Sequence, residues 1–570
     1  MKISRSITNL FTKDKILVIL LVVLSSALAL DPFFHKGIFT AHDIEQNIAR
    51  FGAFQQSFFE GHLFPHWAKD LAQGYGGPIL MLSYSVPYYL ALPFRLFGLS
   101  LVDCIKILNL LTLVGSACLM YLFLRSHFHS FPSFLGSLFY VFAPYRISNI
   151  YARGSIPENT AFVFVPLAAF FLFRYWSRPT VRSIAFLAFS FSLIILSHPF
   201  FGIITAPFFL GYIFYLFHRD KSWQKLGGVI LAVILTVGLT AYFTLPLLIE
   251  SKYTHFDIGP FRTTYKTEGI NLSQLTLPQW SFVDRTGKIE HQTWQLGVLN
   301  IGIFLFSFFI LFLASLKEKV FLGLGIFLFI LASLLSLKIS LPLYELIKPL
   351  QHVQFPWRFL ALNVISLSLL GSAIFSIMER KFKNHLYLLG IAIIFLLLIL
   401  NLPFAHGYNY QAKTDKYYLY EMVTNTEGPA TQPRWSAQPE TYTKKTKQIE
   451  IIEGDGKIRE ISISSTLHTY EIEANTPLYL VDNTFYFPGW RVKVDRKEVP
   501  IEFQNPSYRG LITFKISPGE HFIEVSFGNT KLRLLAKVIS GTTAILVFFL
   551  IILGEVNIPK LVSRLLHRDI

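Results

Sequence analysis

The residues that most clearly suggest chemistry near the start of the chain lie in the segment Ala41-His42-Asp43-Ile44-Glu45. Two carboxylates separated by one residue, next to a histidine, could bind a divalent cation, or one of them could act as a general base. We therefore predict Asp43 and Glu45 as catalytic residues, and as the ligands if a metal is bound, with His42 as a substrate contact. The structural alternative is a solvated helix start that Asp43 caps.

A second candidate segment is a short turn between two apolar runs, with the sequence Tyr151-Ala152-Arg153-Gly154-Ser155-Ile156-Pro157-Glu158. Charged residues at the edge of a bilayer are usually paired or functional. A guanidinium group can donate two parallel N–H groups to a phosphate, so Arg153 could hold a lipid phosphate. We predict Arg153 and Glu158 as substrate-binding residues. The structural alternative is an ion pair between them at the end of a helix.

Two further segments place polar residues where apolar runs begin or end. His198 lies in Ser197-His198-Pro199, between two adjacent runs, and the segment 351–359 contains His352 and Arg358 among aromatic residues. A histidine at a tight turn is often structural, and an arginine beside aromatics is often an interfacial anchor. We nevertheless predict all three as substrate-binding residues, because each is polar and lies at a predicted membrane boundary.

The composition is that of an integral membrane protein. Of 570 residues, 52% are hydrophobic and only 15% are charged, whereas a soluble domain averages about 25% charged residues. The net charge of +16 is expected from basic cytoplasmic loops and attraction to anionic lipid. No basic patch lies on a predicted soluble module, so we expect the lipid bilayer as a partner and do not expect nucleic acid.

The elements that must position these residues are long apolar runs. Runs of membrane length occur at 15–33, 79–98, 105–124, 131–149, 160–176, 182–198, 199–217, 227–248, 297–315, 319–338, 357–377, 384–404 and 535–553. The positions of lysines and arginines predict the direction in which each run crosses the membrane, because cytoplasmic connectors are enriched in these residues. Both ends of the chain are basic, which predicts a multi-pass plasma-membrane protein with a cytoplasmic N-terminus and C-terminus.

Two cytoplasmic ends require an even number of crossings, so one of these runs does not cross. The run 79–98 is the exception, since it contains Pro87, Pro93 and Arg95. Interior prolines break helices, and an arginine in mid-membrane is costly. We predict a re-entrant or interfacial helix there and about 12 spans elsewhere. With this correction, all four candidate segments lie on the outer face.

The predicted fold is mainly α: a membrane helix bundle at 1–404, with a first outer loop at 34–104, followed by an outer β-sandwich-like domain at 405–533. The residues 534–570 form a final membrane helix and a basic cytoplasmic tail. Alternation of apolar and polar residues at 448–451 and 491–495 indicates half-buried strands, and the apolar run 478–481 indicates a more deeply buried one. Turn signals separate these strands, which is typical of a β-sandwich.

Several motifs, in order along residues 40–360, resemble the bacterial membrane proteins labelled 6-pyruvoyl-tetrahydropterin synthase-related. They include Gly61-His62-Leu63-Phe64-Pro65-His66-Trp67, Gly74-Tyr75-Gly76-Gly77-Pro78, Ser83-Tyr84-Ser85-Val86-Pro87-Tyr88-Tyr89 and Tyr140-Val141-Phe142-Ala143-Pro144-Tyr145-Arg146, followed by Arg153, Glu158 and His198. The label names a pterin enzyme, but the sequence lacks the zinc-ligand histidines of a pterin site.

The wider pattern is similar to glycosyltransferase superfamily C, whose members take sugar from a polyprenyl-phosphate donor and carry an acidic residue just after the first span. This resemblance implies that Asp43 occupies the position of the catalytic acid, with Glu45 as a second candidate. The usual Asp-Glu or Asp-x-Asp pair is absent, and Asp43-Ile44-Glu45 is the nearest form. No cofactor is therefore implied with certainty, and the binding of a divalent cation remains an open alternative.

The sequence contains no phosphate-binding glycine-rich loop and no serine nucleophile elbow, so nothing indicates ATP use. We predict an outer-face glycosyltransferase, a hexosyl or pentosyl transferase that moves sugar from a polyprenyl-phosphate donor to a cell-envelope acceptor. The alternative is a non-catalytic transporter or assembly factor for envelope lipids or polysaccharides, in which the same polar residues bind lipid without chemistry.

Overall fold

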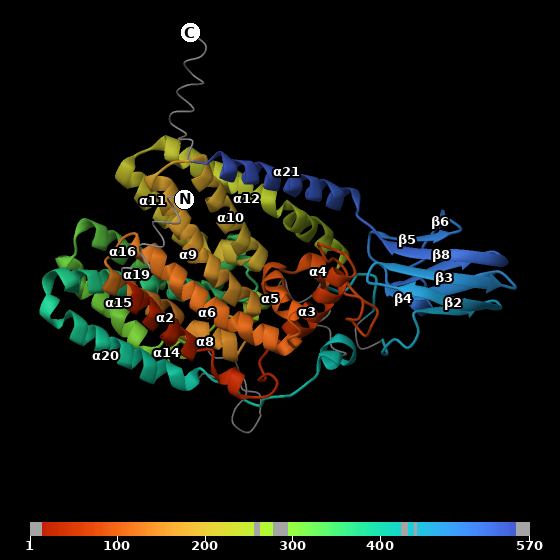
Figure 1. Ribbon diagram of the computed structural model, residues 1–570, viewed down its shortest axis with the longest axis horizontal. Coiled ribbons are helices and arrows are strands. Elements are labelled where there is room, and N and C mark those ends of the chain that lie inside the picture. The colour runs from red at the N-terminus through yellow and green to blue at the C-terminus, as the bar shows by residue number, and fades with distance from the viewer. Residues whose placement is uncertain (1–13, 256–262, 277–293, 423–430, 438–441, 555–570) are drawn as a thin grey trace, which may run out of the picture.

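The computed structural model describes residues 14–255, 263–276, 294–422, 431–437 and 442–554. Within these residues, 8 helices are long and apolar enough to cross a membrane, and 4 shorter apolar helices accompany them. Together they occupy the positions of the expected spans, so the predicted helix bundle is confirmed. Figure 1 shows these helices packed side by side in one body, with the strands in a second body at one end.

The long helices are α6 (Leu101–Arg125), α9 (Ile156–Ser177), α11 (Phe201–Asp220), α12 (Trp223–Glu250), α16 (Leu316–Ser336), α19 (Leu360–Lys381), α20 (Lys383–Asn401) and α21 (Lys531–Leu553). The shorter apolar ones are α2 (Lys15–Ala27), α7 (Ser130–Val141), α10 (Val181–Ser197) and α15 (Val298–Ile310). The helix α19, counted from Pro356, lies at the centre of the bundle, because 94% of its most apolar stretch is buried. In α21 only 17% of the corresponding stretch is buried.

The contacts at the helix ends show that α2 runs antiparallel to α6 and that α12 runs antiparallel to α21. At one end, Arg125 at the end of α6 pairs with Asp14 before α2, at 2.7 Å. At the other end, Glu250 at the end of α12 pairs with Arg533 at the start of α21, also at 2.7 Å. Since α21 directly follows the last strand, this second end carries the β domain. The start of α9, the end of α10 and the start of α19 lie at this β-domain end.

The run 79–98 forms two short helices, α4 (Ile79–Leu82) and α5 (Val86–Leu96), with residues 83–85 between them. Pro87 lies in the first turn of α5 and Pro93 lies inside it. A helix of 11 residues is about 16 Å long, roughly half the thickness of the hydrocarbon core. The Nη1 atom of Arg95 lies 2.9 Å from the Asp415 carboxylate, so its charge is matched by protein.

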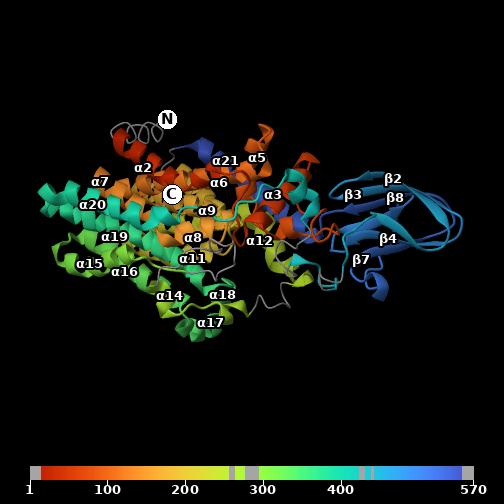
Figure 2. The same cartoon turned by 90° about the horizontal axis from the view of Figure 1, so that it is seen from below.

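The eight strands of the C-terminal domain form two antiparallel sheets, which confirms the sandwich. One sheet has the order β1-β4-β7 and the other β2-β3-β8-β5-β6, and Figure 2 shows β2, β3 and β8 in a different layer from β4 and β7. The strands are β1 (Ile449–Glu453), β2 (Gly456–Ile463), β3 (Leu467–Ala474), β4 (Leu478–Phe485), β5 (Trp490–Val494), β6 (Lys497–Val499), β7 (Leu511–Ile516) and β8 (Gly519–Phe527). Every residue of β4 is buried, as its continuous apolar start predicts.

The first loop after α2 joins the two bodies. Its helix α3 (Ile44–Phe59) packs into the apolar core of the helix bundle. The stretch after α3 instead joins the core of the β domain, where the Trp67 ring meets Trp490 edge-on at 5.3 Å and Tyr75 lies 5.4 Å from Phe485. One loop thus fixes the orientation of the β domain over the β-domain end of the bundle.

Candidate functional site

Asp43 lies immediately before α3 and is held against the turn at 152–154. The backbone N–H groups of His42 and Asp43 donate to the carbonyls of Ala152 (3.1 Å) and Arg153 (2.7 Å). Gly154 makes this close approach possible: its φ is +66°, and a Cβ atom there would lie 2.7 Å from the Cβ atom of Ile44. The Asp43 side chain makes no cap hydrogen bond to α3, so it is available for other partners.

The Asp43 carboxylate has a histidine on one oxygen and an arginine near the other. His42 Nδ1 hydrogen-bonds Asp43 Oδ1 at 2.6 Å, and Arg153 Nε lies 3.8 Å from Oδ2. The Asp43 side chain is 34% exposed, whereas that of Arg153 is 5% exposed. The carboxylate therefore sits at the boundary between a buried charged cluster and open space.

Glu158 is the centre of that cluster. It lies in the first turn of α9 with its side chain fully buried. On one carboxylate oxygen it accepts hydrogen bonds from Tyr145 (2.9 Å) and Asn149 (3.0 Å), both on α8 (Pro144–Tyr151). The other oxygen accepts a hydrogen bond from Arg153 and lies 3.2 Å from Arg358 Nε and 3.7 Å from His198 Nε2. We refer to Glu158, Arg153, Arg358 and His198 as the Glu158 cluster.

Aromatic rings hold both arginines of the cluster. The guanidinium carbon of Arg153 lies 4.7 Å from the centroid of the Trp357 ring, and that of Arg358 lies 4.7 Å from the Phe355 ring. Trp357 in turn stacks on Trp294 at 3.9 Å. Cation–π contacts of this kind stabilise a partly desolvated guanidinium group and fix its plane.

The electrostatics of the cluster keep Asp43 ionised at neutral pH. Burial would raise the pKa of Asp43, but the hydrogen bond from His42 and the positive charge of Arg153 outweigh it, so the pKa lies below its ordinary value. The same hydrogen bond raises the pKa of His42. The pKa of Arg153 is also raised, because the charges of Glu158 and Asp43 outweigh its burial.

Of the predicted site residues, Asp43, His42, Arg153, Glu158, His198 and Arg358 come together, whereas Glu45 and His352 lie apart from them. Glu45 pairs with Lys413 at 2.5 Å. His352 is exposed and follows the short helix α18 (Lys348–Gln351). Because Asp43 and Glu45 have different partners, they do not form a joint ligand pair. Among the described residues, no group of three or more His, Cys, Asp or Glu side chains is placed to hold a metal ion.

Sequence reasoning missed the residues that complete the cluster. Tyr145 and Asn149 are four positions apart on α8, the spacing that places two side chains on one helix face. Asn47 donates to the Gly154 carbonyl at 3.1 Å and accepts from the Tyr84 hydroxyl at 2.5 Å. The polar spacing on α8 was a usable signal, but no sequence pattern connects Asn47 with Tyr84.

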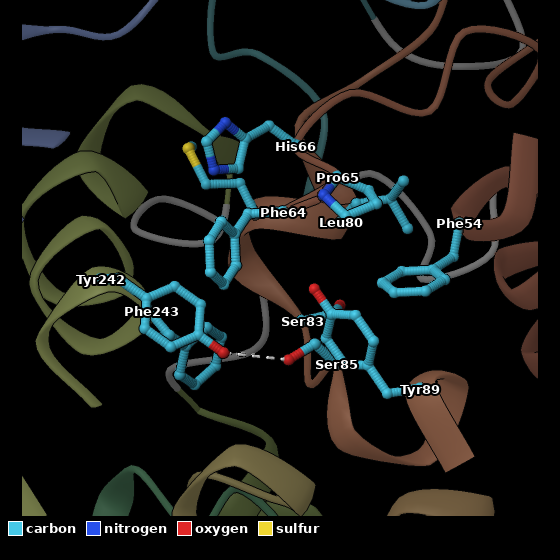
Figure 3. Close-up of a pocket in the computed structure, with 11 residues that line it drawn as sticks. Phe54, Phe64, Pro65, His66, Leu80, Ser83, Ser85, Tyr89, Tyr242 and Phe243 are labelled. Carbon is cyan, nitrogen blue, oxygen red and sulfur yellow. Dashed lines mark hydrogen bonds between the residues drawn. The ribbon is translucent and has the colours of Figure 1, made fainter. Parts of the chain in front are cut away.

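A cavity lies beside this network, between the first loop and α12. Figure 3 shows it with aromatic rings and hydroxyl groups on its walls, and the Ser85 and Tyr242 hydroxyls are hydrogen-bonded at 3.3 Å. Its volume is about 20 Å³, which is room for about one water molecule. Burial lowers the pKa of His66 on its wall to about 3, so this imidazole is neutral. The lining residues are Phe54, Phe64, Pro65, His66, Leu80, Met81, Ser83, Ser85, Tyr89, Tyr242 and Phe243.

The sequence profile of the 6-pyruvoyl-tetrahydropterin synthase related domain, described as a membrane protein, matches residues 83–405. The chain belongs to this family. A relative within the curated proteins is an uncharacterized protein of Lactococcus lactis subsp. cremoris (strain MG1363), 24% identical over 253 residues. That match covers 42% of this chain and 41% of the relative, so it spans less than half of either protein.

Two solved structures are similar to this chain over about two thirds of its length. The arabinofuranosyltransferase AftD from Mycobacteria gives a TM-score of 0.42 at 14% identity, over 68% of this chain and 26% of AftD. The oligosaccharyltransferase of Archaeoglobus fulgidus in its apo form gives 0.40 at 11% identity, over 70% of this chain and 57% of that one. A likeness at these TM-scores assigns no function to the chain.

Proposed function

We propose that this protein is a membrane glycosyltransferase that moves a sugar from a polyprenyl-phosphate donor to a cell-envelope acceptor on the outer face. The observation that carries the proposal is the position of Asp43, an ionised and partly exposed carboxylate within 3.8 Å of an arginine of the Glu158 cluster. A base for the acceptor and a positive charge for the leaving group are thus adjacent.

In the proposed reaction, the Asp43 carboxylate takes the proton of an acceptor hydroxyl while that oxygen attacks the anomeric carbon of the donor. The bond between the anomeric carbon and the phosphate oxygen breaks, and the polyprenyl phosphate leaves with the electron pair. One negative charge therefore moves from Asp43 to the leaving phosphate. Arg153 and Arg358 stabilise that charge electrostatically, which lowers the barrier.

Glu158 has a positioning role in this scheme. It holds two guanidinium groups and His198 around one carboxylate. Glu158 and Asp43 together carry two negative charges against the two guanidinium groups, so one positive charge is left uncompensated near Arg153 and Arg358 once Asp43 takes up the acceptor proton. The cavity of Figure 3 is formed partly by residues 79–98, and this stretch would contribute to the groove that admits a substrate.

The decisive experiment measures transfer of labelled sugar by purified protein bearing Asp43→Asn, with Glu45→Gln as the matched carboxylate-to-amide control. We expect Asp43→Asn to lower kcat by about 10²–10⁴-fold, the usual contribution of a general base. Glu45→Gln should have a much smaller effect, since Glu45 pairs with Lys413 outside the cluster. Transfer by Asp43→Asn at the wild-type rate would refute the assignment of the base.

The donor and acceptor can be identified by mass spectrometry of lipid extracts from cells with and without the protein. A glycan that disappears with the protein would name both. If wild-type protein binds polyprenyl-phosphate sugars but transfers from none of them, the protein is a lipid-binding transporter or assembly factor instead.

A further inference from the structure

A second polar cavity lies beyond the Glu158 cluster, where the chain leaves α2 and where α6 begins. It is open on one side and has a volume of about 360 Å³. Three lysines and one carboxylate are the fully charged groups on its wall. The lining residues are Phe33, His35, Lys36, Gly37, Ser100, Val102, Asp103, Lys106, Ala412 and Lys413. We refer to it as the lysine cavity.

Lys106 is the feature that makes this cavity a built site. Its side chain is only 5% exposed, and its ammonium group donates to the His35 carbonyl at 2.9 Å. The nearest carboxylate, that of Asp103, is 4.0 Å away and half exposed, and it already accepts a hydrogen bond from Ser100 at 2.6 Å. An ammonium group has three donors, and burying it without a close anion is costly. An anion in the cavity would offset that cost.

The other two lysines add positive charge from separate parts of the chain. Lys36 is exposed and follows the 3-10 helix η1 (Asp31–Phe34). Lys413 comes from the segment after α20 and pairs with Glu45. Lysines are normally depleted on the outer side of a membrane protein. Three of them around one cavity at the predicted outer face therefore require a reason beyond solubility.

One residue of the cavity wall, Phe33, belongs to an exposed apolar stretch of the chain. Phe33 and Phe34, in η1 directly after the apolar helix α2, are 42% and 79% exposed, and Leu30 is 41% exposed. Large apolar side chains at the end of a membrane helix are expected to lie among lipid chains at the bilayer boundary. The lysines beside them then lie at the depth of lipid headgroups.

We infer that the lysine cavity binds the phosphate-bearing headgroup of an anionic membrane lipid, with Lys106, Lys36 and Lys413 around the phosphate and Phe33 against the lipid chain. Such a lipid would hold the junction between α2, α6 and the segment after α20 at the membrane surface. This site is separate from the Glu158 cluster and does not depend on sugar transfer.

The test measures lipid retained by the purified full-length protein, by native mass spectrometry, during titration with phosphatidylglycerol, with phosphatidylcholine or with inorganic phosphate. The variants are Lys36→Gln and Lys106→Gln, with Lys497→Gln on the exposed surface of β6 as the matched control. We expect phosphatidylglycerol to bind in preference to phosphatidylcholine. Each cavity variant should weaken this binding about fivefold, the usual contribution of one lysine near an anionic lipid surface, and Lys497→Gln should not.

Equal retention of both lipids, or retention that neither cavity variant changes, would overturn the inference. So would saturation of the cavity by inorganic phosphate without retention of phosphatidylglycerol, since the ligand would then be a soluble phosphate. Lys36 is exposed, so Lys36→Gln remains informative even if Lys106→Gln fails to fold. The assay contains no sugar donor, so its failure and the failure of the proposed glycosyl transfer are separate outcomes.

Discussion

Two fully buried carboxylates, Glu158 in the helix bundle and Asp482 in the β domain, have opposite kinds of surroundings. Asp482 accepts hydrogen bonds from Gln448 (2.8 Å) and Tyr470 (2.7 Å) and is hydrogen-bonded to His468 at 2.9 Å. None of these partners is an arginine or a lysine. Glu158 is surrounded instead by two guanidinium groups and a histidine.

The two sites also differ in how many buried polar atoms near them lack a hydrogen-bond partner. Among the described residues near Asp482, the one such atom is Nε1 of Trp490, whose ring lies 5.4 Å from His468. Beside Glu158, within the part of the chain that the structure describes, the buried amide atoms of Asn159, the Ser197 hydroxyl and His198 Nδ1 have no hydrogen-bond partner. Buried polar groups without partners are costly. The Asp482 cluster therefore has the character of a structural network, whereas the Glu158 cluster has the buried guanidinium groups and the unused polar atoms expected of a binding site.

The largest effect is expected from replacing the carboxylate that organises the arginines. Glu158→Gln should lower the stability of the helix bundle by about 3–5 kcal/mol, because it removes the carboxylate that pairs with Arg358 and leaves Arg153 with only the partly exposed Asp43, 3.8 Å away. It should also abolish sugar transfer. The measurement is thermal unfolding of the purified protein together with the transfer assay. Unchanged unfolding would mean that Glu158 does not hold the cluster.

The same chemical change in the β domain should cost less and should spare activity. Asp482→Asn removes the charge from a network whose donors include no arginine or lysine, which we expect to lower stability by about 1–3 kcal/mol. Sugar transfer by the folded fraction should stay at the wild-type rate. If Asp482→Asn reduces transfer as strongly as Glu158→Gln, the distinction between the two clusters is wrong.

A smaller effect is expected where the first loop meets the cluster. Gly154→Ala places a side chain in left-handed backbone, at a cost of about 1–2 kcal/mol, and against Ile44. Asp43 should then move away from Arg153. We therefore expect the transfer rate to fall by more than the loss of folded protein explains. Ala152→Gly, two residues earlier in the same turn, serves as the control, and equal rates in the two variants would argue against a requirement for the contact.

The smallest effect is the response to pH near neutrality. A base must be ionised to act, and the pKa of Asp43 lies below its ordinary value. The transfer rate should therefore stay level through neutral pH and fall only below about pH 4, the ordinary range of an aspartate. A pH–rate profile of the purified protein checks this. A fall between pH 6 and 7 would point to a histidine as the base instead.

Much of the fold could be predicted because apolar runs and strand alternation report local burial. The helix bundle follows from runs such as 105–124 and 357–377, and the sandwich follows from the alternation at 448–451 and 491–495. Pro87, Pro93 and Arg95 likewise marked 79–98 as a stretch that does not form one membrane-spanning helix, and it forms the two short helices α4 and α5. These properties belong to short stretches of chain and need no knowledge of their neighbours.

The candidate site could be predicted only as a set of residues. Sequence alone singled out Asp43, Arg153, Glu158 and Arg358, since each is polar at a membrane boundary, but it gave Glu45 and His352 equal standing. Only the packing of α9 against α8, α10 and the start of α19 decided that Arg358 faces Glu158, and that Glu45 faces Lys413 instead. Ion pairs between distant segments depend on which helices pack together, and no local pattern carries that information.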